Sequence, residues 1–387
     1  MKSNFTQTIP LSLYIHLPWC VKKCPYCDFN SHTLNNELPE QAYIDALLLN
    51  LEQHLPSVWG RRIISIFMGG GTPSLFSSAA LDKLLQGVRA RTQLTVDAEI
   101  TIEANPGASE MQRFKEYREI GINRISLGIQ SFNDAHLKRL GRIHGREEAL
   151  HAINYVKNAG FDNFNLDLMF GLPNQTPEQG LADLATAIEA NPTHLSWYEL
   201  TLEPNTPFYL QPPPLPPEED ILSLQEKGQA LLLAHGYHQY EVSAYSKNRP
   251  CQHNMNYWEF GDYLAIGAGA HGKITDCNQQ TISRITHFRH PKQYMDISQG
   301  FVQTNTPIPQ DNLAFEFMLN ALRLKKGVET ALFTQRTGLP MKHIEPQLNE
   351  AYKKGWIHDY SDRICTTPLG YQFLNDVVAL FLQSETV

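Results

Sequence analysis

The sequence contains no run of 18 apolar residues, so no membrane-spanning helix is expected. It begins without the charged and apolar segments of a secretion signal, which predicts a cytoplasmic protein. Positive charge is also in deficit, because 32 Lys and Arg stand against 40 Asp and Glu and leave a formal charge of −8. An acidic chain is poorly suited to neutralising phosphates, so we expect no nucleic-acid partner. Peripheral membrane contact and a homodimer are both compatible with this composition.

Cysteine is scarce and unevenly placed. Three of the six cysteines, Cys20, Cys24 and Cys27, fall within eight residues. Because thiols stay reduced in the cytoplasm, this group predicts metal ligation or redox chemistry and not a structural disulfide. The remaining composition is that of an ordinary globular protein, with 42% apolar and 19% charged residues. A length of 387 residues predicts two to three domains.

Apolar, β-branched runs alternate with amphipathic helical runs from the start of the chain. Strands are expected at residues 11–17, 63–69, 98–104, 124–130, 163–170 and 194–201, and helices near 40–54, 78–91, 109–120, 146–159 and 177–190. Six strands joined by crossover helices predict parallel β/α units. The expected fold class is therefore α/β, a partial (β/α)6 TIM-like barrel that occupies residues 1–305.

The last part of the chain has a different pattern and is expected to form a second domain, residues 306–387. Helices are expected near 311–326, 329–337, 341–354 and 368–383, with a short hairpin over 356–366. This order predicts a small, mostly helical, winged-helix-like domain. Between the two parts, a Pro-rich extended loop is expected at 211–217 and a helix at 218–235.

The three cysteines have the spacing C-x3-C-x2-C and follow the first strand directly. Three thiolates on one tight loop suit a [4Fe–4S] cluster whose fourth iron is left open for another ligand. A zinc site is an alternative, in which His32 would serve as the fourth ligand. A second alternative is a dithiol redox pair of Cys24 and Cys27, although it leaves Cys20 without a role.

Glycine or polar residues recur at the same relative place on successive strands. The second strand leads into Gly-Gly-Gly-Thr-Pro at 69–73, the third ends in Glu103, the fourth ends in Gln130, and the fifth carries Asp167. In a parallel barrel, function gathers at the carboxyl ends of the strands. These residues and the three cysteines are therefore expected to meet at one end of the barrel.

A three-cysteine loop after the first strand and a glycine turn after the second resemble the radical S-adenosylmethionine superfamily. The resemblance implies a [4Fe–4S] cluster, held by the three cysteines, whose open iron binds the methionine part of S-adenosylmethionine. It also implies cleavage of the sulfonium by one electron from the cluster, which yields a 5′-deoxyadenosyl radical.

Residues 13–20, 69–74, 139–142 and 171–176 resemble the oxygen-independent coproporphyrinogen III oxidase family more closely. Carried over position by position, the family's S-adenosylmethionine contacts are Tyr14, Tyr26, Gly70, Gly71, Thr72, Glu103, Gln130, Arg142 and Asp167. Two departures matter. The oxidases have a fourth cysteine where this chain has Phe29, and they have a longer arm before the first strand. Both departures indicate the haem-chaperone branch of the family, which does not decarboxylate coproporphyrinogen.

The function implied by this branch is that of a haem chaperone, which binds haem and a cluster with S-adenosylmethionine and transfers haem to apo-haemoproteins. An oxygen-independent coproporphyrinogen III oxidase is the alternative. A radical enzyme that acts on an unrelated substrate also stays open, because the substrate is selected by cavity side chains that the sequence does not place.

The segment His253-Asn254-x-x-Tyr257-Trp258 resembles a signature of the haem-chaperone branch, which implies haem contacts for these four residues. Imidazole is a common axial ligand of haem iron, and aromatic rings can cover the porphyrin. We expect this segment on a loop that reaches the cavity mouth, with Cys251 as a second candidate ligand. A histidine held in a loop beside core aromatics is the alternative.

The pattern G-x-G-x-x-G at 267–272 is not followed by a helix, so it does not predict a dinucleotide site. It is expected to form a strand and a tight turn that close the barrel. Four further residues are expected to line the cavity: Tyr198, Glu199, Glu203 and Glu241.

Overall fold

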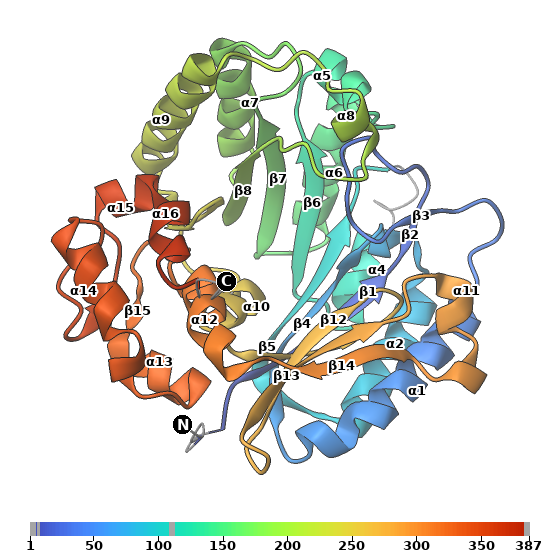
Figure 1. The fold of residues 1–387 in the computed structure, drawn as a ribbon. Helices are drawn as coiled ribbons and strands as arrows, with labels where there is room; N and C mark the ends of the chain where they lie inside the picture. Colours follow the sequence, from blue (N-terminus) through green and yellow to red (C-terminus); the bar gives the residue numbers. More distant parts are fainter. Residues whose placement is uncertain (1–4, 6–7, 108–112, 383–387) are drawn as a thin grey trace.

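One curved sheet organises the molecule (Figure 1). The computed structural model describes residue 5 and residues 8–107 and 113–382, and within them twelve strands form a sheet of order β14-β13-β12-β11-β1-β4-β5-β6-β7-β8-β10-β9. The strands are β1 (Leu11–Leu17), β4 (Arg62–Gly70), β5 (Gln93–Ala104), β6 (Arg124–Gln130), β7 (Phe164–Phe170), β8 (His194–Glu199), β9 (His238–Glu241), β10 (Ala244–Ser246), β11 (Asp262–Ile266), β12 (His271–Asp276), β13 (Thr281–His287) and β14 (Val302–Pro307).

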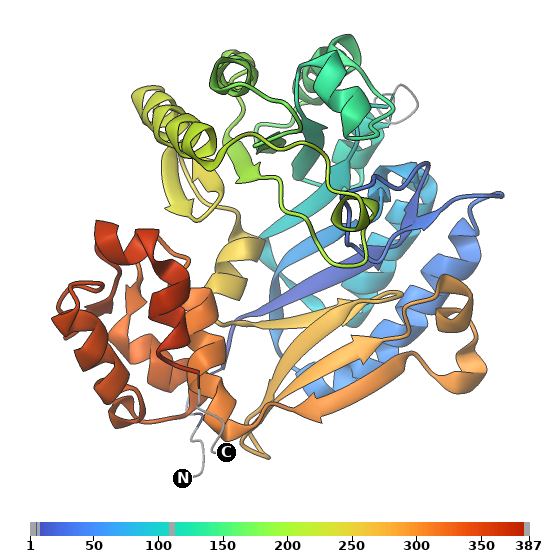
Figure 2. The same cartoon turned by 45° about the horizontal axis from the view of Figure 1, so that its top comes forward.

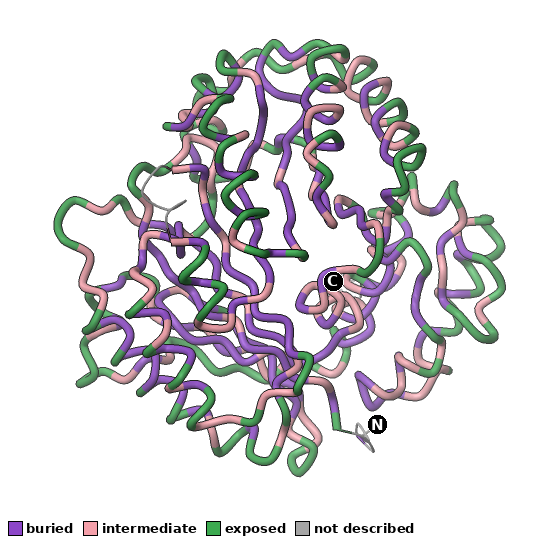
Figure 3. The backbone as a smooth tube through the Cα atoms, turned by 180° about the vertical axis from the view of Figure 1, so that it is seen from behind, coloured by how far each residue is buried: buried purple, intermediate pink, exposed green. Residues whose placement is uncertain are grey.

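The six predicted β/α strands are confirmed. Strands β1, β4, β5, β6, β7 and β8 pair in parallel in this order. Their sequences are nearly continuous apolar runs because helices or side chains cover both faces, and Figure 3 shows these strands as largely buried. The parallel arrangement brings their carboxyl ends to one edge of the sheet.

Helices lie between the strands of the sheet along the chain. They are α1 (Glu40–Val58), α2 (Ser78–Arg91), α4 (Phe114–Glu119), α5 (Asp134–Arg139), α6 (Arg146–Asn158), α7 (Pro177–Glu189), α8 (Pro207–Leu210), α9 (Glu218–Ala234), α10 (Gln252–Trp258) and α11 (Pro291–Tyr294). Thr176 starts α7 through a capping box with Gln179, and Pro177 occupies the first turn. The helix predicted near 109–120 corresponds to α4, and its first residues, up to 112, lie outside the described residues.

The stretch 261–272 forms a strand and a turn, as expected, but it does not close the barrel. Strand β11 pairs in parallel with β1 on the side opposite β4, and β12, β13 and β14 extend the sheet outward from it. Figure 2 shows β11–β14 as an arm beside β1. In the described part of the chain, β14 and β9 are the two ends of the sheet and are not paired with each other, so the barrel is open.

The C-terminal part is helical, as expected, and its last helix is interrupted. Its helices are α12 (Leu313–Ala321), α13 (Thr330–Thr337), α14 (Glu345–Lys353), α15 (Pro368–Gln372) and α16 (Leu374–Ala379), and β15 (Val328–Glu329) pairs with β16 (Arg363–Ile364). The expected hairpin is reduced to a bridge between Ile357 and Thr366. The single helix predicted over 368–383 is wrong, because the backbone at Phe373 leaves the helical region between α15 and α16. Residue 383 lies outside the described residues.

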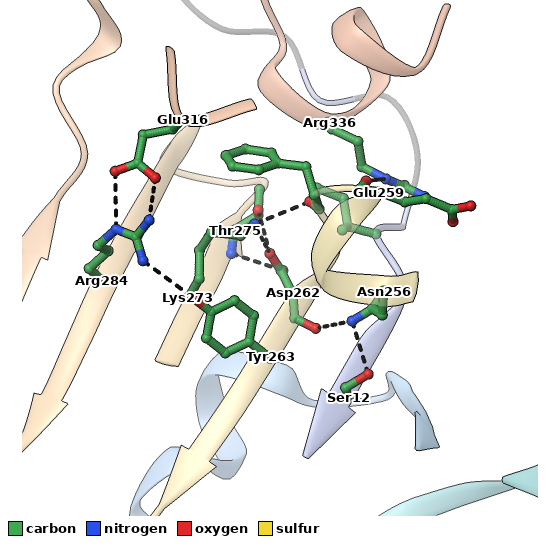
Figure 4. Close-up of polar contacts among 12 residues, drawn as sticks. Ser12, Asn256, Glu259, Asp262, Tyr263, Lys273, Thr275, Arg284, Glu316 and Arg336 are labelled. Atoms are coloured by element: carbon green, nitrogen blue, oxygen red, sulfur yellow. Dashed lines mark hydrogen bonds and ion pairs between the residues drawn. The ribbon is translucent and has the colours of Figure 1, made fainter. Parts of the chain in front are cut away.

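A buried carboxylate joins the arm to the rest of the sheet (Figure 4). Asp262, at the start of β11, is fully buried and accepts hydrogen bonds from the Thr275 hydroxyl at 2.8 Å and from the Arg61 guanidinium at 2.8 Å. Its Oδ1 lies 3.3 Å from Nζ of Lys273, which is also buried. Removing one member of such a group leaves an unpaired charge in the interior.

Among the described residues, no helix is long and apolar enough to cross a membrane.

We predict that Asp262→Ala lowers the free energy of unfolding by about 3–5 kcal/mol, because Lys273 then loses its buried partner. Urea unfolding of the apoprotein, followed by tryptophan fluorescence, measures this loss. Asp45→Ala is the matched control, since Asp45 pairs with Lys83 at the surface and should contribute less than about 1 kcal/mol. Equal losses in the two variants would contradict a structural role for the buried group.

Candidate functional site

A cavity of about 340 Å³ lies at the carboxyl edge of the parallel strands, and we call it the cysteine cavity. Cys20, Cys24 and Cys27 line it. Eight of the nine residues expected to contact S-adenosylmethionine line it too: Tyr26, Gly70, Gly71, Thr72, Glu103, Gln130, Arg142 and Asp167. The ninth, Tyr14, lines a neighbouring cavity. Residues from five parallel strands and the cysteine loop therefore meet around one space.

The cysteine loop is held by short-range backbone contacts. It runs between β2 (Trp19–Cys20) and β3 (His32–Thr33), which pair in parallel, and the amide of Cys27 bonds the carbonyl of Cys24 at 3.2 Å. The Thr72 hydroxyl donates to Sγ of Cys20 at 3.4 Å, and Arg142 Nη1 donates to Sγ of Cys24 at 3.7 Å. Each of these two sulfurs is therefore oriented by a different segment, Thr72 after β4 and Arg142 after α5.

Burial raises the pKa of the Cys20 thiol and, likewise, that of the Cys27 thiol. A metal binds the thiolate form, so loading of the loop must release protons. His32 does not join the three cysteines: its Nε2 lies 3.3 Å from the Arg289 carbonyl, and its ring is stacked edge-on against His290. In the described part of the chain no group of three His, Cys, Asp or Glu side chains is placed to hold a single metal ion.

The glycine turn brings bare backbone against the cysteine loop. Gly70 has φ of +109°, and a Cβ there would lie 2.3 Å from the His16 ring. A Cβ on Gly71 would lie 2.6 Å from the Trp19 carbonyl oxygen, directly before Cys20. Only glycine fits at these two positions, because the protein itself fills the space of a side chain, and the turn lines the cysteine cavity as a cradle of bare main chain.

Two half-buried carboxyl groups face this cradle. Glu103 accepts a hydrogen bond from the Gly70 amide at 3.1 Å, and its pKa is raised to about 7, first by burial and then by the nearby Asp167. Burial also raises the pKa of Asp167, although Ser126 and Asn165 donate to it at 2.9 and 2.8 Å. Carboxyl groups held in this way are typical of sites that receive a charged or hydrogen-bonding ligand.

Arg142 and Gln130 complete the opposite wall. Arg142 Nη2 donates to Oδ1 of Asn105 at 2.5 Å and to the Gly128 carbonyl at 2.7 Å. Gln130 has φ of +69°, which is unusual for a residue with a side chain, and its Oε1 accepts from the Tyr198 hydroxyl at 2.8 Å. Such a backbone conformation at the end of a strand is a feature of binding and catalytic sites.

The sequence did not predict several other residues that line the cysteine cavity: Ser31, Asn105, Ser126, Gly128, Ser196 and Ser243. A signal existed for two of them, because Ser126 and Gly128 precede Gln130 at intervals of two on β6 and must share its face. Of the four further residues expected at the cavity, Tyr198 lines it. Glu241 lies elsewhere, bonded to Arg323, and Glu199 and Glu203 are not among the lining residues.

A second cavity of about 980 Å³ borders the first, and we call it the large cavity. Tyr14 and His16 on β1, the arm β11–β14 and α12 contribute to its walls. Residues 253–258, which the sequence predicts to contact haem and which we call the haem segment, contribute Tyr257 and Trp258. The two cavities share Phe29, Gly70 and Glu103 in their linings, so they adjoin at the cysteine loop.

The haem segment forms helix α10 and not the expected loop. Glu99 of β5 accepts hydrogen bonds from the His253 amide at 3.2 Å and from the Cys251 thiol at 3.2 Å. These contacts hold the start of the helix. His253 is 1% exposed, and its ring nitrogens lie 3.0 Å from the Ser65 hydroxyl and 2.7 Å from the Tyr257 hydroxyl. Burial lowers its pKa to about 3, so the ring is neutral. Asn254 is half-buried on the same helix.

The donor set of the cysteine cavity fits the cluster and the ligand that the sequence implies. Three thiols, a side-chain-free turn, two carboxyl groups and an arginine line the same cavity. This combination supplies sulfur ligands for three irons and hydrogen-bonding groups for a polar molecule beside them.

Comparison with known proteins agrees with this geometry. Residues 14–185 match the radical SAM superfamily, and residues 308–373 match the HemN C-terminal domain. The chain is 50% identical to heme chaperone HemW of Escherichia coli (strain K12) over 375 residues, 96% of this chain and 98% of that protein. It is 32% identical to heme chaperone HemW of Bacillus subtilis (strain 168) over 381 residues, 96% and 99% of the two chains.

The fold expectation is also confirmed by a solved structure. Coproporphyrinogen III oxidase (HemN) from Escherichia coli, a radical SAM enzyme, matches with a TM-score of 0.81 at 25% identity, over 97% of this chain and 90% of that one. Half of the residues are identical to HemW over nearly the whole length, so this sequence is much more similar to HemW than to the oxidase. This chain therefore belongs to the HemW family of radical SAM proteins.

Proposed function

We propose that this protein is a haem chaperone, which holds a [4Fe–4S] cluster and S-adenosylmethionine in the cysteine cavity, binds haem and passes it to apo-haemoproteins. One observation carries the proposal: three cysteines and eight of the nine expected S-adenosylmethionine contacts surround a single cavity. The match of residues 14–185 to the radical SAM superfamily supports the proposal, and relatives in the HemW family are named heme chaperones.

Each part of the cysteine cavity has a role in this proposal. Cys20, Cys24 and Cys27 bind three irons, and when bound the cluster supplies one-electron reduction next to S-adenosylmethionine. Gly70 and Gly71 let the methionine part reach the main chain. The aromatic ring of Tyr26 covers the adenine, at the side of the cavity where it packs with Phe208.

The charged residues orient the ligand. Ionised Glu103 accepts a hydrogen bond from the amino group and lies in the field of the sulfonium charge. Asp167 and Gln130, on neighbouring strands, accept from the ribose hydroxyls. Arg142 holds Cys24 through its Sγ and faces the ligand with a fixed positive charge.

An oxygen-independent coproporphyrinogen III oxidase is the second candidate, and the likeness to HemN favours it. Against it, Phe29 occupies the place of the oxidases' fourth cysteine. Its side chain is 59% exposed and lies where the two cavities meet. A phenyl ring supplies apolar surface at this point and no sulfur ligand.

The cluster assignment predicts about four iron and four sulfide per chain after anaerobic reconstitution. Cys20→Ala, Cys24→Ala or Cys27→Ala should each lose the cluster, as measured by iron content and EPR after reduction. S-adenosylmethionine should perturb the EPR signal of the wild-type protein through the open iron. Cys277→Ala, at an exposed cysteine, is the control and should retain full iron content. A stable zinc-only protein would overturn the assignment.

The pKa of Glu103 predicts a pH dependence of S-adenosylmethionine binding. A carboxyl group with a pKa of about 7 is protonated below that pH and ionised above it. Affinity should therefore rise between pH 6 and pH 8, by at most about tenfold per pH unit for one proton. Calorimetric measurement of binding to wild type and to Glu103→Gln isolates this effect, because protonation of the ligand itself affects both proteins equally. Parallel pH profiles in the two proteins would show that Glu103 is not responsible.

The choice between chaperone and oxidase predicts two further outcomes. The reconstituted protein, supplied with reductant and S-adenosylmethionine, should bind haem and activate an apo-haemoprotein. It should leave coproporphyrinogen III unchanged, as measured by chromatography of the porphyrins. Efficient formation of protoporphyrinogen IX would favour the oxidase instead.

A further inference from the structure

The large cavity is a second binding site beside the cysteine cavity. Its volume of about 980 Å³ lies at the upper end of the range for cofactor and small-molecule sites. The shared lining residues Phe29, Gly70 and Glu103 place it directly against the space assigned to the cluster and S-adenosylmethionine. A ligand there would be larger than S-adenosylmethionine and would lie next to it.

The walls of the large cavity suit a flat apolar molecule. Six aromatic residues line it: Tyr14, Phe29, Tyr257, Trp258, Phe260 and Tyr263. They come from β1, the cysteine loop, α10 and β11, and so they face the cavity from several sides. Aromatic rings provide large contact areas for a planar macrocycle, whose burial is driven mainly by the hydrophobic effect.

Three histidines line the cavity, and only one of them has an uncommitted ring in the described part of the chain. His16 bonds the Tyr14 hydroxyl at 2.9 Å and the Asn30 carbonyl at 2.9 Å, so both of its nitrogens are in use. His287 is buried and bonds the Ala270 carbonyl at 3.0 Å and His54 at 3.2 Å. The ring of His271 is exposed and makes no hydrogen bond with a described residue.

The position of His271 directs it over the cavity. It begins β12 and lies opposite Thr286 of β13, which in turn lies opposite Thr304 of β14. Cross-strand neighbours share a face of the sheet, and all three residues line the cavity. The hydroxyls of Thr286 and Thr304 bond each other at 2.6 Å, and neither is bonded to the neighbouring His271 ring.

Among the described residues that line the cavity, one Arg or Lys side chain has no ion-pair partner. Lys273 is paired with Asp262, and Arg284 with Glu316 of α12, as Figure 4 shows. Arg289 is exposed at the rim, and its guanidinium has no ion pair among the described residues. A guanidinium in this position can bind a carboxylate of a ligand in two-point geometry.

We propose that haem occupies the large cavity, with His271 as its axial ligand and Arg289 as the partner of a propionate. This assignment rests on the proposed function and names the place where that function binds its cargo. Within the signature segment, Tyr257 and Trp258 serve as walls of the site. His253, in contrast, holds α10 against β4 through Ser65 and does not reach the cavity lining.

Titration of the reconstituted full-length protein with haem, followed by the Soret spectrum, tests the assignment. His271→Ala should weaken haem binding at least about tenfold, the scale found when the support of a metal ligand is lost. Added imidazole should restore the bound spectrum in this variant, because it can enter the vacated space. His238→Ala, at an exposed histidine on β9, is the matched control and should bind like wild type. Iron and sulfide content of the cluster checks that each variant is folded.

Arg289 is tested with haem and its dimethyl ester. Wild type should bind haem more tightly than the ester, and Arg289→Gln should remove this preference. An unchanged preference would overturn the role of Arg289.

Three outcomes separate the two levels of the proposal. Failure of the wild-type protein to bind haem would overturn the proposed function itself. Haem binding by wild type with an unchanged spectrum and affinity in His271→Ala would overturn only the present site. A spectrum altered in a cluster-loaded His253→Ala but not in His271→Ala would place the ligand on α10 instead.

Discussion

The parallel pairing of β11 with β1 is the constraint on which both cavities depend. Because β1 lies between β4 and β11, one strand leads into the cysteine loop and also forms a wall of the large cavity. The turn after β11 packs so closely that a Cβ on Gly267 would lie 2.4 Å from the His16 carbonyl oxygen. Asn30, three residues after the last cysteine, donates to the carbonyls of Ala268 and Arg289 at 2.9 and 2.8 Å. The cysteine loop and the arm are thus held as one unit.

Acidic groups are compensated differently in the arm and in the cysteine cavity, and this difference fits the roles proposed for these two parts. In the arm, Asp262 has four donors within 3.3 Å and is a structural group. In the cysteine cavity, Glu103 is half-buried, with a main-chain donor and with Asp167, a like charge, nearby. The first arrangement stabilises the apoprotein, whereas the second is completed only when a ligand with donors or positive charge arrives.

Much of the fold and of the cysteine cavity follows from sequence, because periodicity and strand-end residues are local signals. The six parallel strands are confirmed for this reason, and the strand-end residues Glu103, Gln130 and Asp167 line one cavity with the cysteines. The position of His253 could not be predicted from the sequence, because α10 is held by Glu99, which lies more than 150 residues earlier in the chain. The role of the glycines at 267–272 could not be predicted from the sequence either. They permit contact with β1 and the cysteine loop, and no local sequence pattern indicates such a contact.

We propose that haem and the cluster occupy adjoining cavities at one edge of the sheet. An anomalous difference map at the iron edge, from crystals of the cluster-loaded protein with haem, measures this directly. We expect one compact peak at the three cysteines and a second, single-iron peak bonded to His271, with Phe29 between them. A haem iron at the protein surface, between two chains, or bonded to His253 inside α10 would contradict it.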